Sequence, residues 1–239
     1  MKPCLLAILI FPFFFSYAQQ NKFQAAENAY ANGRYQYAID LYQQLIEEPF
    51  NQPELFFNLG NAAYKEGDLA LAIKSYRRAQ YLAPTDPDIH ANLRYALEAT
   101  GAPIPEVSRF NHLFFSLSEN QWIQFTIGLY ALLIITLFII LMINRPRVIL
   151  NRLAGLLTFF LVISITALTQ YQKRNNNPEY VIIDSKAAAK LAPLENSKTA
   201  FNLPVGALIT VIRIHHSEWV QVRINHQTGW LKINQIEPI

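Results

Sequence analysis

Two long apolar runs without a charged side chain constrain the fold of this chain more than any other feature. The first extends from Phe125 to Ile143 and the second from Leu153 to Tyr171. A helix of that length, rising about 1.5 Å per residue, reaches roughly 28 Å, enough to cross the hydrocarbon layer of a bilayer. Only 15% of the chain is charged and 52% is hydrophobic. The sequence therefore predicts two transmembrane helices, at residues 122–143 and 153–171.

The segments that flank these helices indicate their orientation. Residues 144–152, NRPRVILNR, contain three arginines, and short basic loops remain in the cytoplasm. Trp122 and Tyr171 lie at the opposite ends, where aromatic rings favour the membrane interface. We expect residues 101–121 to be a linker that includes an interfacial segment, FNHLFFSLS, which lies along the membrane surface or packs against the repeats. Residues 172–178 are expected to be a second linker.

The opening MKPCLLAILIFPFFFSYAQQ has the layout of a secretory signal. One lysine precedes an apolar core, and Ser16-Tyr17-Ala18 supplies small residues for a cut after Ala18. We predict a signal peptide at residues 1–18, the alternative being an uncleaved membrane anchor. Cys4 is the only cysteine and precedes the apolar core, which does not fit a lipid attachment site. Cleavage would leave no thiol for a disulfide, a nucleophile or a metal site.

Between residues 19 and 86 the chain repeats itself with a period of 34 residues. The aligned pairs are Ala26 with Gly60, Gly33 with Gly67, Ala38 with Ala72, Ile39 with Ile73, and Tyr42 with Tyr76. This period resembles that of the tetratricopeptide repeat, a hairpin of two helices. We therefore assign two repeats, 19–52 and 53–86.

Small residues in the second repeat support this assignment. Gly60 and Ala72 remove bulk where the two helices cross, so that the larger side chains around them interlock. Gly67-Asp68 is expected to form the turn between the helices. Residues 87–100 begin a third unit that stops at Gly101-Ala102-Pro103, so we predict a capping helix that covers the last apolar face.

The first helices of such repeats present a concave face, where we expect partner proteins to bind. Asparagine pairs with the backbone of an extended ligand, and tyrosine adds a flat ring with a polar tip. The predicted partner-binding residues are Glu27, Tyr30, Asn58, Asn61, Tyr64, Lys65, Asn92 and Tyr95. The alternative is that these are ordinary solvated packing residues. Lysine and arginine are too few for a clamp on two carboxylates, and Glu27 stands where that clamp has asparagine, so a receptor for peptide carboxyl termini is not expected.

Residues 179–239 change to short β-rich runs, YVII, ALITVIRI, EWVQVRI and GWLKI, separated by turn-like segments. This pattern predicts a small antiparallel barrel or sandwich. The sequence resembles a bacterial SH3-like domain at Leu203–Gly206, Glu218–Val222 and Thr228–Leu231. The segment AAAKLAP replaces the Asn-Val-Arg turn that this family usually has, which leaves the ligand of the domain open.

Several functions are not expected from this sequence. His215 and His216 would point to opposite faces of a strand, and no further ligands accompany them, so no metal site is predicted. The chain lacks a Ser-His-Asp order, a glycine-rich phosphate loop and a paired-acid motif, so we predict no enzymatic activity and no cofactor. The net charge of +3 without a basic run argues against nucleic acid. Neither apolar run holds Asp, Glu, Lys, Arg or His, which argues against transport.

The order of these parts resembles the BatE family of the bacterial aerotolerance operon. The segments NLGNAAYKEGD, ANLRYALE and GWLKINQIEPI carry the resemblance, together with the pair of spans. The resemblance implies a multi-domain protein of the bacterial inner membrane, with an all-α repeat solenoid, two transmembrane helices and an all-β SH3-like barrel. It further implies a periplasmic scaffold that works with von Willebrand factor A-domain proteins and a MoxR-type ATPase in oxidative-stress tolerance. The alternative is a membrane-anchored module that binds peptidoglycan through its SH3-like domain.

Overall fold

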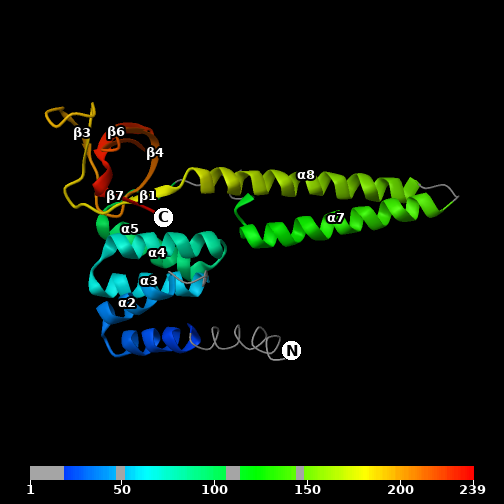
Figure 1. Cartoon of the computed structure of the whole chain (residues 1–239), viewed down its shortest axis with the longest axis horizontal. Coiled ribbons are helices and arrows are strands. Elements are labelled where there is room, and N and C mark those ends of the chain that lie inside the picture. Colours follow the sequence, from blue (N-terminus) through cyan, green and yellow to red (C-terminus); the bar gives the residue numbers. More distant parts are fainter. Residues whose placement is uncertain (1–18, 47–51, 106–113, 144–147) are drawn as a thin grey trace, which may run out of the picture. The chain divides into compact units, whose positions relative to one another are not determined.

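A computed structural model describes the chain over residues 19–46, 52–105, 114–143 and 148–239 (Figure 1). The predicted signal peptide and residues 144–147 of the arginine loop lie outside these residues. The described residues fall into two compact units. One contains those of Met1–Leu82, Asp86–Pro105 and Glu179–Ile239, and the other contains those of Ala83–Thr85 and Glu106–Pro178.

The amino-terminal part of the first unit is made of helices. Residues 19–31 form the first of them. It is followed by α2 (Tyr35–Ile46), α3 (Pro53–Glu66), α4 (Leu69–Leu82) and α5 (Pro87–Thr100). Helix α3 packs against both α2 and α4, and α4 packs against α5. The all-α repeat region predicted from the 34-residue period therefore consists of successive helices packed against their neighbours.

The ends of these helices are set by identifiable residues. Pro53 starts α3, where the missing N–H costs nothing, and Gly67 ends it in the left-handed conformation with φ of 94°. Its N–H donates to the carbonyls of Ala63 and Tyr64. The carboxylate of Asp86 caps α5 by accepting from the N–H groups of Asp88 and Ile89.

Glycine is required where α3 meets α4. A Cβ atom added to Gly60 would lie 2.6 Å from two ring carbons of Tyr76, well inside van der Waals contact. Tyr76 is only 2% exposed and its ring also meets that of Phe57. The small residue that the sequence places at this crossing is thus in contact with a buried aromatic ring of the opposite helix.

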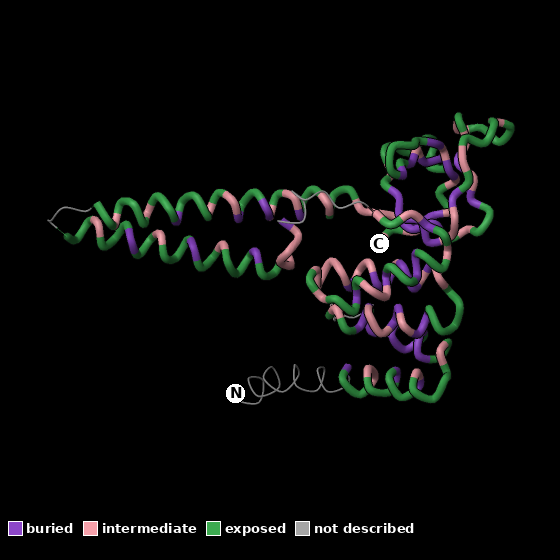
Figure 2. Tube along the Cα trace, turned by 180° about the vertical axis from the view of Figure 1, so that it is seen from behind, coloured by how far each residue is buried: buried purple, intermediate pink, exposed green. Residues whose placement is uncertain are grey.

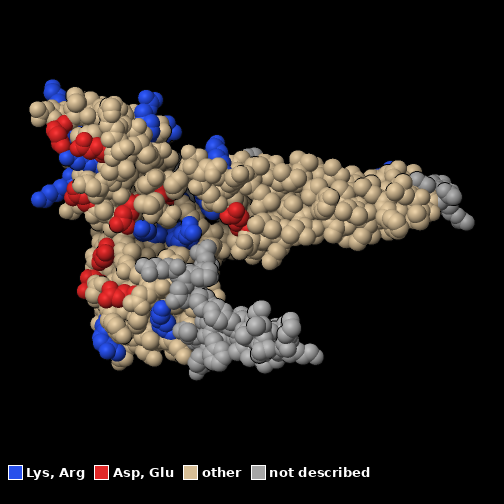
Figure 3. Space-filling model, viewed as in Figure 1, with Lys and Arg blue, Asp and Glu red and all other residues tan. Residues whose placement is uncertain are grey.

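The second unit is dominated by two long helices, α7 (Glu119–Met142) and α8 (Val148–Asn176), which pack against each other. Both are long and apolar enough to cross a membrane. Figure 2 shows that most of their residues are exposed, and Figure 3 shows almost no charged atoms along them on the face in view. The hydroxyls of Thr126 and Ser164 hydrogen-bond to each other between the two helices.

Helix α8 is longer than the predicted span. It begins at Val148, within the range assigned to the basic loop, and continues to Asn176, within the range assigned to a linker. The sequence contains no proline between Pro146 and Pro178, so nothing interrupts the backbone hydrogen bonds between them. The polar residues at its carboxyl end therefore extend the helix rather than ending it.

Aromatic side chains gather at one end of the two long helices. The indole Nε1 of Trp122 donates to the carbonyl of Phe114 at 2.8 Å. The rings of Phe115 and Tyr171 lie 5.0 Å apart, and the guanidinium of Arg174 lies over both. The described end of the predicted interfacial segment thus packs on α7 and α8, within its own unit.

The carboxyl-terminal region is an antiparallel sheet. Its strands are β1 (Glu179–Ile182), β2 (Ala188–Lys190), β3 (Thr199–Asn202), β4 (Leu208–His215), β5 (Trp219–Ile224), β6 (Gln227–Lys232) and β7 (Ile236–Pro238). They are ordered β3-β2-β6-β5-β4-β1-β7, which leaves β3 and β7 as edges. The predicted antiparallel β-domain is confirmed. A closed barrel is not formed by these described pairings, so the SH3-like assignment stays a prediction.

The turn between β4 and β5 changes the expected position of the two histidines. His216 and Ser217 have positive φ values of 50° and 56°, the geometry of a tight hairpin turn. His216 is therefore in the turn rather than on the strand, and its ring lies 4.0 Å from that of His215. The expectation that the two rings point to opposite faces was wrong, because the strand ends at His215. In the described part of the chain, no group of three or more His, Cys, Asp or Glu could hold a metal ion.

The contact between Gly60 and Tyr76 yields a prediction about stability. Gly60→Ala should destabilise the α3–α4 hairpin by about 1–3 kcal/mol, because the new methyl group overlaps the Tyr76 ring. Hydrogen exchange of α3 and α4 amides in the full chain, followed by mass spectrometry, measures the loss.

The control for this experiment is the same substitution in a Tyr76→Leu background. Without the ring, alanine should stabilise α3 by up to about 1 kcal/mol, because its helix propensity exceeds that of glycine. If Gly60→Ala reduced the stability of the hairpin equally in both backgrounds, the contact with Tyr76 would not be the reason that position 60 requires glycine.

Candidate functional site

A cavity of about 300 Å³ opens on the concave face of the repeats. Its walls come from the helix at residues 19–31 and from α3, α4 and α5. The lining residues are Tyr30, Asn61, Tyr64, Lys65, Tyr76, Asn92 and Tyr95. We call it the concave pocket.

The structure brings most of the predicted partner-binding residues together in this pocket. Tyr30, Asn61, Tyr64, Lys65, Asn92 and Tyr95 line it. Glu27 and Asn58 do not. Glu27 is exposed on the first helix, and Asn58 is half-buried and hydrogen-bonds to the Tyr42 hydroxyl.

Sequence reasoning missed one lining residue, Tyr76. We assigned it to the packing between α3 and α4, where its ring does lie, but its hydroxyl reaches the concave pocket. A tyrosine where phenylalanine would pack equally well was the available signal, since a buried hydroxyl requires a partner.

Asn61 organises the polar atoms of the pocket. Its Oδ1 accepts one hydrogen bond from the Tyr76 hydroxyl at 2.8 Å and another from Nδ2 of Asn92 at 2.9 Å. These bonds fix both amide groups. The Nδ2 of Asn61 and the Oδ1 of Asn92 are then a donor and an acceptor, the pair that the C=O and N–H groups of a peptide backbone require.

Burial determines the protonation of Tyr76. Desolvation raises the pKa of this phenol well above its usual value, and the neighbouring Tyr30 raises it further. The hydroxyl therefore stays protonated at physiological pH and remains a donor to Asn61.

The rim of the concave pocket is aromatic and carries a positive charge. Tyr64 is 38% exposed and Tyr95 is 57% exposed, which is high for rings of this size. Both present a flat apolar surface beside the exposed Lys65. None of the described residues that line the concave pocket is Asp or Glu. The site thus has groups suited to a peptide backbone, an apolar side chain and a negative group.

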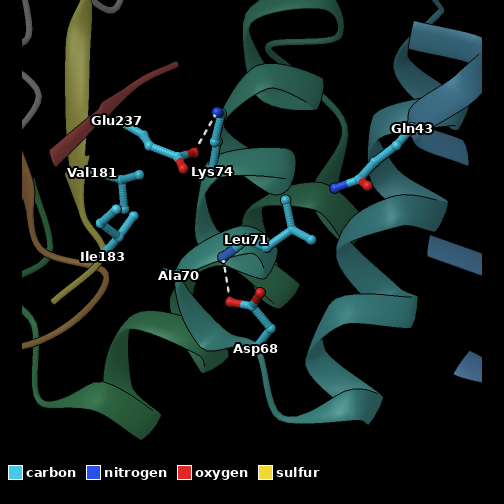
Figure 4. Close-up of a pocket in the computed structure, with 8 residues that line it drawn as sticks. All are labelled: Gln43, Asp68, Ala70, Leu71, Lys74, Val181, Ile183 and Glu237. Carbon is cyan, nitrogen blue, oxygen red and sulfur yellow. Dashed lines mark hydrogen bonds and ion pairs between the residues drawn. The ribbon is translucent and has the colours of Figure 1, made fainter. Parts of the chain in front are cut away.

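A second cavity, of about 250 Å³, lies where α4 meets the sheet (Figure 4). It is lined by Gln43, Asp68, Ala70, Leu71, Lys74, Val181, Ile183 and Glu237. Lys74 Nζ binds Glu237 Oε2 at 2.8 Å, and Asp68 Oδ1 accepts from the N–H of Leu71 at 2.9 Å. Figure 4 shows the Lys74–Glu237 pair at one end of the cavity and Asp68 at the other.

Next to this cavity, a bidentate ion pair joins α4 to β1. Arg77 donates from Nε to Glu179 Oε2 at 2.7 Å and from Nη2 to Oε1 at 3.1 Å. The Tyr81 hydroxyl adds a third bond to the same carboxylate, at 2.6 Å. Burial is the largest single effect and would lower the pKa of Arg77, but the charges and hydrogen bonds of Glu179 and Tyr81 together outweigh it, and the pKa is raised. Arg77 is therefore charged, and its guanidinium matches the carboxylate in both charge and shape.

A glycine in the turn before β4 completes this contact, which we call the junction. A Cβ atom at Gly206 would lie 2.2 Å from Cδ1 of Ile73, and its φ of +80° also favours glycine. Repeats and sheet therefore form a close contact in which both the backbone and the ion pairs take part.

Comparison with known proteins identifies the class of the helical region. Residues 23–87 match the tetratricopeptide repeat family. No curated protein matches the chain. The helices and the concave pocket thus belong to a protein that contains tetratricopeptide repeats, and the repeat prediction is confirmed. This fold presents surfaces for other proteins, which favours protein binding as the role of a pocket on its concave face.

The junction yields a prediction about cross-linking. A water-soluble carbodiimide joins ammonium and carboxylate groups that touch, so treatment of the full chain should link Lys74 to Glu237, whose atoms are 2.8 Å apart. Mass spectrometry of tryptic peptides would detect the isopeptide bond. Lys232 and Glu195, which also form an ion pair, provide a positive control within the same molecule.

The matched variant is Lys74→Arg, which keeps the charge but has no amine to couple. It should lose the link to Glu237 and retain the one between Lys232 and Glu195. Formation of the second link without the first in the unmodified chain would contradict the junction.

Proposed function

We propose that this chain is a non-enzymatic scaffold of the bacterial inner membrane that binds partner proteins through its concave pocket. The observation that carries the proposal is the Asn61–Asn92 pair, held in place by Tyr76 on a tetratricopeptide-repeat fold. A preformed donor and acceptor beside exposed tyrosines suits an extended segment of a partner protein.

The two long helices and the junction support this membrane arrangement. Arg77 and Glu179 lie on either side of α7 and α8 in the sequence and form an ion pair. Both residues must therefore be in the same compartment, which favours a hairpin that crosses the membrane twice. The predicted signal peptide and the arginine loop support the periplasm as that compartment.

The resemblance to the BatE family suggests the partners. We propose a Bat-type complex with von Willebrand factor A-domain membrane proteins and a MoxR-type ATPase, linked to aerotolerance and oxidative stress. In such a complex the scaffold holds one component at the pocket while the hairpin keeps the assembly at the membrane.

The alternative is a peptidoglycan-binding module that uses the carboxyl-terminal domain, with the repeats as a spacer. The junction favours the scaffold, because the sheet is bound to α4 by Arg77 and Lys74, whereas a spacer would keep the sheet away from the repeats.

Site-specific photo-cross-linking tests the pocket. A benzophenone amino acid in place of Tyr64 or Tyr95, in the full chain in its native membrane, should give the same cross-linked partner, a protein with a von Willebrand factor A-domain. Tyr37 is the matched control, since it is an equally exposed tyrosine at 50% but does not line the pocket. Equal products from all three positions would argue against the concave pocket as the binding site.

Alkaline phosphatase fusions test the membrane arrangement separately. Fusions after residue 105 and at residue 239 should be active, and a fusion within residues 145–152 should be inactive. Activity at only one of the two ends would contradict the double crossing, and activity only in the loop would place both domains in the cytoplasm.

A further inference from the structure

Two lysines from neighbouring strands lie over the same indole ring. Lys190 ends β2, Lys232 ends β6, and Trp219 begins β5. The ammonium nitrogens lie 5.5 and 5.8 Å from the centroid of the Trp219 ring. The ring is only 6% exposed, so the two side chains cover it. The two positive charges repel each other, so the pair of lysines favours an anion between them.

That anion is the carboxylate of Glu195. Lys190 Nζ lies 3.6 Å from Glu195 Oε2, and Lys232 Nζ binds Oε1. Lys190 also donates to the backbone carbonyl of Glu195. The hydrogen bond from Lys232 is the main reason that the pKa of Glu195 is lowered. The carboxylate is therefore ionised and held by both lysines.

The carboxylate and the lysines differ in how they are supported. Glu195 belongs to the loop at residues 191–198, and its side chain is 62% exposed. Leu191 and Leu194 in this loop are each 64% exposed, so no core holds them. The loop is supported by its own bonds, such as that from the N–H of Ala192 to Ser197 Oγ at 3.0 Å. The two lysines are on paired strands, whereas the carboxylate of Glu195 is on an exposed loop.

A second aromatic ring lies beside the two cations. Trp230 is paired with Lys190 across β2 and β6, is half-buried, and lies 5.9 Å from the ring of His215. A ligand with a negative group at the lysines could place its body on this ring. Lys190 belongs to the segment AAAKLAP, where the sequence departs from the SH3-like pattern.

We propose that Lys190, Lys232 and Trp219 form a binding site for a ligand that carries a carboxylate, and that Glu195 occupies this site as an internal competitor in the free protein. The group that binds there already is a carboxylate, which defines the ligand class. A tethered competitor acts like a millimolar concentration of free carboxylate, so an incoming ligand must gain further contacts, and Trp230 offers them. This site is separate from the concave pocket and does not depend on it.

Fluorine NMR of the full chain tests the proposal. The protein has three tryptophans, so 5-fluorotryptophan labelling gives one signal each for Trp122, Trp219 and Trp230. The probe is sodium acetate, with sodium chloride at the same ionic strength as the reference. In Glu195→Gln, acetate should shift the Trp219 signal saturably, with half-saturation at about tenfold lower concentration than in the unmodified chain. The Trp122 signal should not move.

Two further variants make the result decisive. Glu195→Gln combined with Lys190→Gln and Lys232→Gln should lose the acetate-dependent shift of Trp219. Glu195→Gln combined with Lys186→Gln removes one exposed lysine elsewhere on the domain and should keep it. The dispersion of the three signals before acetate is added shows that each variant is folded. Acetate responses that are equal in all variants, or that are no stronger in Glu195→Gln than in the unmodified chain, would overturn the proposal.

Discussion

Helix α4 determines the arrangement of the first unit, because consecutive residues on it bind in different directions. Tyr76 packs on Gly60 and reaches the concave pocket, where it donates to Asn61. The next residue, Arg77, binds Glu179 at the junction. Neither contact tolerates much displacement, since the first depends on a glycine and the second on two parallel hydrogen bonds. The pocket and the sheet are thus positioned by the same helix.

The sequence was sufficient to predict the repeats, because their determinants are local and periodic. Gly60 and Tyr76 recur at the same spacing as Ala26 and Tyr42, and periodic side-chain patterns translate directly into helix contacts. The pocket was predicted in large part for the same reason. Glu27 falls outside it, because its equivalence to Asn61 in the repeat gives a position along a helix but not the curvature that closes a cavity.

No comparable pattern in the sequence predicts the junction. Arg77 and Glu179 are 102 positions apart, and a single basic or acidic residue in a sequence is usually solvated. The same limit applies to Lys190 and Lys232, which become neighbours of Trp219 only through strand pairing. The predicted directions of the His215 and His216 side chains were wrong for a different reason. A strand was extended by one residue, and a shift of one residue reverses the direction of a side chain.

The junction also changes what connects the repeats to the long apolar helices. A linker was expected at residues 172–178, but α8 continues to Asn176, and β1 begins at Glu179. Only Asn177 and Pro178 separate them, and proline restricts the residue before it. Glu179 is itself the residue that Arg77 holds. The concave pocket is therefore linked, through α4 and one ion pair, to β1, the strand that follows α8 in the chain.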